Sequence, residues 1–170
     1  MKKAELFNIP FIHFPGPYDE KHYRQILEAT NPDFIMCSGW IKPIYGLPEN
    51  RTINIHPGPL PWFGGKGMYG RHVHEAVIEA YRKGDIFQSA VSFHFVNDEY
   101  DRGAGIVRIP VIIRPDDDVE SLAARVLKVE HNYQSLVLNE VIQGRIVLGR
   151  GNQILFAKGS SLERFKFLNF

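Results

Sequence analysis

Three side chains that could perform acid–base chemistry stand at the ends of two predicted strands. Asn54 and His56 are two residues apart in the apolar run 52–56, so on a strand they project from the same face. Pro57 then ends the strand, because proline has no N–H to donate. Asp101 lies in a polar loop bounded by glycine, directly after another predicted strand. A carboxamide, an imidazole and a carboxylate are therefore presented from strand ends.

This set of side chains suits the attack of an amine on a carbonyl carbon. The amide of Asn54 can donate to a developing oxyanion, while the imidazole of His56 and the carboxylate of Asp101 can share the movement of a proton. The alternative is that Asn54 and His56 satisfy a turn and that Asp101 caps one. These are common residue types, so their spacing alone favours that structural interpretation and names no substrate.

Other polar motifs are poorer candidates for a site. His72 and His74 are two apart on a predicted helix and face different directions, so we predict no metal there. The loop 64–67, Gly-Gly-Lys-Gly, lacks the G-x-x-x-x-G-K-S/T spacing of a phosphate-binding loop. The acidic run 116–118 is more typical of a helix N-terminus than of a cation site.

The predicted elements alternate in the manner of an α/β protein. The first strand, the first helix and the second strand should form a β-α-β unit with a right-handed crossover. Asp19 is placed to cap the first helix and Gly144 to end the last one. The predicted strands are 9–14, 34–38, 52–56, 89–96 and 105–113, and Pro110 should break the last of them. The predicted helices are 20–30, 69–82 and about 116–143. Residues 145–148 and 153–157 should form a hairpin, and residues 160–170 show no clear period.

Composition limits the class of protein. A chain of 170 residues with 44% hydrophobic residues can form one domain with a core, and a net charge of +1 argues against a nucleic-acid surface. The single cysteine, Cys37, fits a reducing cytoplasm. No stretch approaches the roughly 18–20 apolar residues that cross a membrane, and the first residues lack the apolar segment of a secretory signal. We expect a cytoplasmic protein that binds a small molecule and has no nucleic-acid or membrane partner.

The order of the motifs resembles the folate-dependent formyltransferases, most closely the phosphoribosylglycinamide formyltransferases of purine synthesis. The matching stretches are 54–65, 91–106 and 118–131, and the resemblance runs from about residue 4 to about 148. It implies an α/β fold with a Rossmann-like, mostly parallel sheet and flanking helices. It also implies a catalytic domain at residues 1–148, followed by a C-terminal hairpin and tail at residues 149–170.

The resemblance implies a role for each site residue. Asn54 would stabilise the oxyanion formed when a primary amine attacks the formyl group of 10-formyltetrahydrofolate, and His56 and Asp101 would handle the protons. His94 would support the aspartate, and Glu130 would contact the amine substrate. Two loops would enclose the pterin of the folate co-substrate through Trp40, Ile41, Lys42, Ile44, Asn97, Asp98, Glu99 and Tyr100.

The chain departs from the family pattern in its first residues. The glycine-rich loop that holds the substrate phosphate in the family has no counterpart, because residues 4–10 already resemble a later stretch. Such shortening would expose the side of a parallel sheet, so we expect a homodimer or a partner chain to cover it. Three functions stay open: formyl transfer to glycinamide ribonucleotide or to a related amine such as that of a sugar nucleotide, hydrolysis of the formyl-folate, and folate binding without catalysis.

Overall fold

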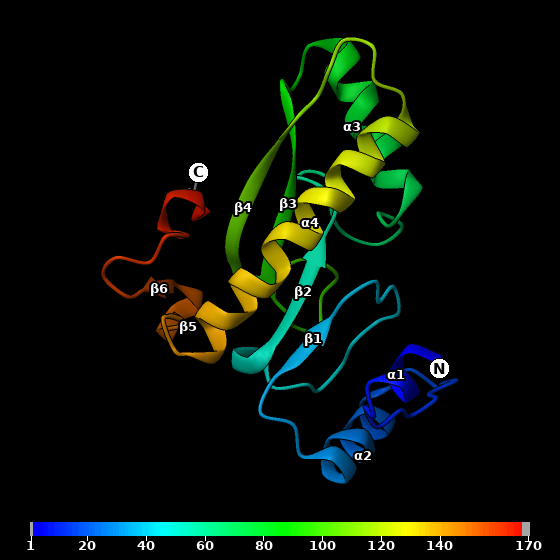
Figure 1. Cartoon of the computed structure of the whole chain (residues 1–170), viewed down its shortest axis with the longest axis vertical. Helices are drawn as coiled ribbons and strands as arrows, with labels where there is room; N and C mark the ends of the chain where they lie inside the picture. The colour runs from blue at the N-terminus through cyan, green and yellow to red at the C-terminus, as the bar shows by residue number, and fades with distance from the viewer. Residues whose placement is uncertain (1, 168–170) are drawn as a thin grey trace.

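The structure, a computed structural model, describes residues 2–167. Within them, a sheet has the strand order β1-β2-β3-β4, and a separate hairpin pairs β5 with β6 (Figure 1). The strands are β1 (Ile35–Cys37), β2 (Thr52–His56), β3 (Gln88–Phe95), β4 (Gly105–Ile112), β5 (Ile146–Leu148) and β6 (Ile154–Phe156). The α-helices are α1 (Lys2–Leu6), α2 (Glu20–Thr30), α3 (Arg71–Lys83) and α4 (Val119–Ile142), and the short 3-10 turns are η1 (Glu49–Arg51), η2 (Arg150–Asn152) and η3 (Glu163–Phe165).

The four-stranded sheet is mixed. β1 and β2 run parallel, whereas β3 pairs antiparallel with both β2 and β4. The short loop 96–104 requires the antiparallel pairing of β3 with β4, because parallel neighbours need a longer crossover. The expected α/β fold with flanking helices is confirmed, and within residues 2–167 the parallel pairing is confined to β1 and β2.

β3 forms the centre of the core. Every residue of β3 after Gln88 is buried, since it lies between β2 and β4 and is covered by helices. α4 runs along the sheet beside β3 and β4, and α3 packs against α4 (Figure 1). The apolar stripe predicted for 69–82 is confirmed, because Val73 and Val77 of α3 are fully buried.

The strand predicted at residues 9–14 is wrong. These residues form neither helix nor strand, and Ile9, Phe11 and Ile12 are exposed. A strand needs a neighbour for its backbone N–H and C=O groups, and Pro10 removes one of those donors, so the apolar pattern alone does not produce a ladder. The predicted β-α-β unit around α2 is therefore absent from the described residues.

The other predicted elements form close to their expected positions. Asp19 caps α2 by accepting the backbone N–H of His22 at 2.9 Å, and Gly144, with a φ of +67°, follows the end of α4. β4 is not broken at Pro110, because β4 is an edge strand and can accommodate a residue that lacks an N–H. The unassigned tail contains η3, and its residues 168–170 lie outside the described part.

Candidate active site

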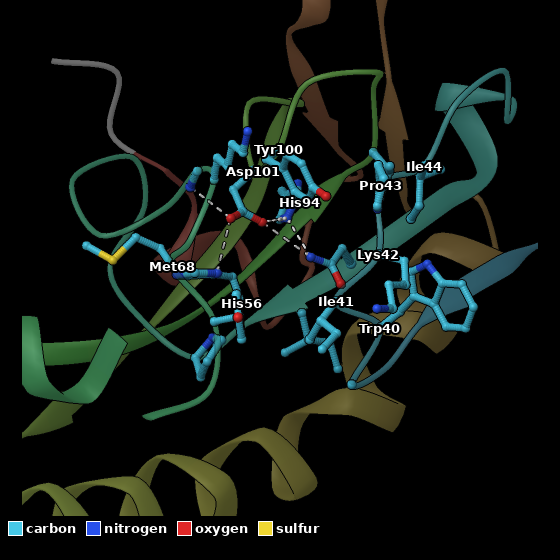
Figure 2. A pocket seen from close by; sticks show the side chains of 18 of the residues that line it. Trp40, Ile41, Lys42, Pro43, Ile44, His56, Met68, His94, Tyr100 and Asp101 are labelled. Carbon is cyan, nitrogen blue, oxygen red and sulfur yellow. Dashed lines mark hydrogen bonds and ion pairs between the residues drawn. The ribbon is translucent and has the colours of Figure 1, made fainter. Parts of the chain in front are cut away.

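A pocket of about 670 Å³ lies where the loops after β1, β2 and β3 meet (Figure 2). Every site residue predicted from the sequence lines it, together with residues that the sequence did not single out as site residues. The predicted ones are Trp40, Ile41, Lys42, Ile44, Asn54, His56, His94, Asn97, Asp98, Glu99, Tyr100, Asp101 and Glu130. Parallel pairing of β1 with β2 brings the loops that follow these two strands to the same end of the sheet. β3 runs antiparallel to β2, so the loop after β3 starts beside the beginning of β2, and its residues 97–101 line the same pocket.

The carboxylate of Asp101 is the centre of the polar cluster in the pocket (Figure 2). Its Oδ1 lies 3.5 Å from Nδ2 of Asn54 and 3.5 Å from Nε2 of His94. Its Oδ2 lies 3.5 Å from Nδ1 of His56 and accepts the backbone N–H of Gly65 at 2.9 Å. The three residues predicted from strand ends therefore lie together, with Asn54 and His56 on either oxygen of the Asp101 carboxylate.

Backbone carbonyls determine which nitrogen of each imidazole carries a proton. Nε2 of His56 lies 2.7 Å from the carbonyl oxygen of Phe63, and Nδ1 of His94 lies 2.8 Å from that of Phe95. A carbonyl oxygen only accepts, so each of these ring nitrogens carries the hydrogen. The other nitrogen of each ring faces Asp101 and, in the neutral ring, is an acceptor.

The amide of Asn54 completes this arrangement. Its Nδ2 lies 3.2 Å from Nε2 of His94, to which it donates one hydrogen. The second N–H points toward Asp101 at the longer distance of 3.5 Å, so it is only weakly engaged. Asn54 therefore has a donor that a ligand oxygen in the pocket can recruit.

Burial shapes the charges of the central pair. Burial lowers the pKa of His56 below 6.5, although Asp101 and the Phe63 carbonyl oppose the shift. Burial alone would raise the pKa of Asp101, but a hydrogen bond from the protonated ring of His94, the charge of protonated His56 and the N–H of Gly65 together outweigh it, so that pKa falls below 3.8. At neutral pH the site thus holds an ionised carboxylate next to a neutral imidazole that can take up a proton.

The loop after β2 supplies two backbone groups that the sequence analysis missed, the carbonyl of Phe63 and the N–H of Gly65. Gly65 has a φ of +101°, a conformation that residues with a Cβ rarely adopt. Asp101 also has a positive φ, +55°, which is uncommon for a residue other than glycine. Backbone groups carry no residue-type signature, and only the glycine at position 65 could have pointed to one of them.

A second set of contacts fixes the loop 39–46 at the other end of the pocket. The hydroxyl of Tyr23 donates to the carbonyl of Pro43 at 2.6 Å and accepts from Nε1 of Trp40 at 3.2 Å. Oδ1 of Asp98 accepts the backbone N–H of Gly46 at 3.0 Å. The two loops expected to enclose a flat heterocycle are therefore tied together and to α2.

Glu130 reaches the pocket from α4. It is half-buried, and burial raises the pKa of its carboxyl group, which His131 counteracts only in part. Within residues 2–167, no group of three or more His, Cys, Asp or Glu side chains is placed to hold a metal ion. None of the helices in this described part is long and apolar enough to span a membrane.

The sequence matches the family described as formyl transferase over residues 15–138. It is 38% identical over 155 residues to the chloroplastic phosphoribosylglycinamide formyltransferase of Arabidopsis thaliana, covering 84% of this chain and 51% of that protein. It is 30% identical over 147 residues to the phosphoribosylglycinamide formyltransferase of Haemophilus influenzae, covering 84% of this chain and 64% of that protein. The chain thus spans about half the length of the plant relative.

Solved structures show the same likeness. The phosphoribosylglycinamide formyltransferase of Anaplasma phagocytophilum superposes with a TM-score of 0.75 at 27% identity, covering 94% of this chain and 76% of that one. The corresponding protein of Coxiella burnetii gives a TM-score of 0.72 at 28% identity, with 91% and 73% covered. The expected family fold is therefore present over most of the chain.

Proposed function

The chain belongs to the formyltransferase family, and we propose that it transfers a formyl group from 10-formyltetrahydrofolate to the primary amine of glycinamide ribonucleotide or of a related small molecule. The observation that carries this proposal is the carboxylate of Asp101, which lies 3.5 Å from the acceptor nitrogen of His56 and 3.5 Å from the amide of Asn54. An oxyanion donor and a proton acceptor stand together at one wall of the pocket.

The pocket fits the co-substrate by size and by the chemistry of its walls. A volume of about 670 Å³ lies within the range of small-molecule sites, roughly 300–1,000 Å³. The loops 39–46 and 97–100 offer main-chain groups and the rings of Trp40 and Tyr100, which suit a flat heterocycle with polar edges. When bound, the formyl-folate would supply an activated formyl carbon.

The residues of the chain then have distinct tasks. Asn54 would donate its weakly engaged N–H to the oxygen that becomes negatively charged during amine attack. His56 would take up the amine proton at Nδ1, where the ionised Asp101 stabilises the resulting imidazolium. The imidazolium would then return a proton to the folate nitrogen as the bond between that nitrogen and the formyl carbon breaks and tetrahydrofolate leaves. Glu130 would orient the amine substrate from the α4 side of the pocket.

The test is formyl transfer by the purified chain with several acceptors. Glycinamide ribonucleotide, free glycinamide and an amino-sugar nucleotide are each incubated with 10-formyltetrahydrofolate, and mass spectrometry detects the formylated amine. Transfer to any of them supports the proposal. Consumption of the formyl-folate without a formylated amine would indicate hydrolysis instead, and folate binding without turnover would indicate a binding protein.

Three further features stay predictions. A catalytic unit at 1–148 and a tail at 149–170 can be tested by limited proteolysis. Cytoplasmic localisation rests on the single, buried Cys37 and can be tested by fractionation. The third prediction concerns β1, which within residues 2–167 pairs on one side only. We predict that a second copy of the chain or a partner chain covers its free edge, and light scattering tests for the second copy.

A further inference from the structure

A row of three paired residues crosses the sheet, starting from the proposed proton acceptor His56. His56 on β2 pairs in register with Ser92 on β3, and Ser92 pairs in register with Arg108 on β4. The loop 57–65 leaves β2 at His56, and it bonds to both Ser92 and Arg108. The same loop carries the two backbone groups that contact His56 and Asp101.

Ser92 holds the first half of this loop. Its hydroxyl donates to the carbonyl of Gly58 at 2.7 Å and accepts the backbone N–H of Leu60 at 3.2 Å. Ser92 is fully buried, so a serine at this position satisfies two backbone groups that water cannot reach. An alanine would leave both groups without a partner.

Arg108 holds the middle of the loop, at Leu60 and Trp62. Nη2 of Arg108 donates to the carbonyl of Leu60, and its guanidinium lies over the rings of Trp62 at 4.7 Å and Phe167 at 4.5 Å. Within residues 2–167 no carboxylate offsets the charge of Arg108, since burial is the sole influence that shifts the pKa of its guanidinium, which it lowers, and its Nε has no hydrogen-bond partner. Placing a half-buried cation without a counter-charge is unfavourable, so its contacts point to a role in holding the loop.

These anchors act at a short distance from the site. The N–H of Phe63 donates to the carbonyl of Pro59 at 3.2 Å, which makes residues 59–63 a closed turn. The carbonyl of Phe63 is then fixed 2.7 Å from Nε2 of His56. A shift of the Leu60 end of this turn would move that carbonyl away from the imidazole.

We propose that Ser92 and Arg108 are positioning residues that hold the loop 57–65 so that the Phe63 carbonyl keeps the proton of His56 on Nε2 and leaves Nδ1 toward Asp101. Its catalytic consequence rests on the proposed function. The location of the proton is a property of the protein alone and can be measured without any substrate.

The experiment is nitrogen-15 NMR of the imidazole rings in the full chain, with the His56 signals assigned by a His56→Gln variant. The wild-type ring should show the pattern of a single Nε2–H tautomer at neutral pH. Ser92→Ala and Arg108→Gln should each give averaged shifts of two tautomers. If transfer is active, each variant should lower kcat by about tenfold and leave the KM for the folate within about twofold.

Matched control variants lose comparable bonds elsewhere. Arg51→Gln removes a guanidinium that donates to the carbonyl of Pro32 at 2.9 Å, and Ser160→Ala removes a hydroxyl that donates to Glu140 at 2.8 Å. Neither residue lines the pocket, so both controls should keep the wild-type His56 pattern. Unchanged His56 tautomer shifts in folded Ser92→Ala and Arg108→Gln would overturn the proposal.

A milder pair of variants covers the case in which these proteins do not fold. Arg108→Lys keeps the positive charge but loses the planar guanidinium that contacts both rings. Phe167→Leu removes one of the two rings and keeps the arginine. Both should give a smaller shift toward mixed tautomers, and wild-type spectra in both would also overturn the proposal. Absence of formyl transfer in the wild type would contradict the proposed function but leave the NMR result decisive.

Discussion

Nδ1 of His56 lies 3.5 Å from Oδ2 of Asp101, and the two side chains are 3% and 11% exposed. Nε2 of His56 donates to Phe63, so in the neutral ring Nδ1 presents a lone pair to a carboxylate. Protonation of Nδ1 turns this unfavourable contact into an ion pair. His56 can therefore take up a proton on Nδ1, and the ionised Asp101 stabilises the resulting positive charge.

Asp101→Asn should reduce kcat for formyl transfer by at least about 100-fold, because the neutral amide cannot stabilise an imidazolium. Loss of the carboxylate should also lower the pKa of His56 further, since Asp101 is the largest influence that raises it. Initial rates and an NMR titration of His56 check both effects. Asp116→Asn, at an exposed position outside the pocket, should behave as wild type. Retained activity in Asp101→Asn would remove Asp101 from the mechanism.

The free energy of unfolding should fall as the pH decreases below 6.5, the ordinary pKa of histidine. Burial lowers the pKa of both His56 and His74 in the folded chain, so just below pH 6.5 the unfolded chain binds more protons. Urea titrations should give a lower free energy of unfolding at pH 5 than at pH 7. His74→Gln should reduce the difference, whereas His13→Gln, at an exposed site, should not.

Tyr23→Phe should raise the KM for the folate about fivefold and change kcat little. The hydroxyl that it removes joins Trp40 to the carbonyl of Pro43, and one such bond contributes about 1 kcal/mol to the order of the loop 39–46. Steady-state kinetics with varied folate, together with quenching of tryptophan fluorescence by the folate, measures the effect. Tyr133→Phe, outside the pocket, is the matched control. An unchanged KM in Tyr23→Phe would show that this bond does not order the site.

Much of the fold follows from local patterns. α2, α3 and α4 form where apolar periodicity and capping residues agree, as at Asp118, which caps α4 together with Ser121. The failure at residues 9–14 has a different origin, because a strand depends on a partner that no local pattern encodes. The apolar run there satisfies strand propensity but not the hydrogen bonds of a ladder.

The sequence predicts which side chains form the site but not the distances between them. Side chains such as Asn54 and Asp101 carry chemistry that a sequence displays, and their order resembled a known family. Their mutual distances depend on the register of β2 against β3, which places Asn54 opposite His94. The carbonyl of Phe63 contributes no side-chain chemistry to the site. The proton on His56 therefore depends on a group that only the folded chain reveals.

Gly65→Ala should lower kcat more than its cost in stability explains. Gly65 has a φ of +101° and Gly67 a φ of +90°, and an added Cβ would meet no atom within 4 Å at either position. Both substitutions should therefore cost a similar backbone strain, about 1–2 kcal/mol. Of the two glycines, only Gly65 donates its N–H to Asp101, at 2.9 Å. Gly65→Ala alone should therefore shift this donor and raise the pKa of Asp101. Urea unfolding should give similar free energies of unfolding for the two variants, whereas the pH dependence of kcat should differ between them. Equal kcat values in both variants would show that the Gly65 amide does not affect the pKa of Asp101.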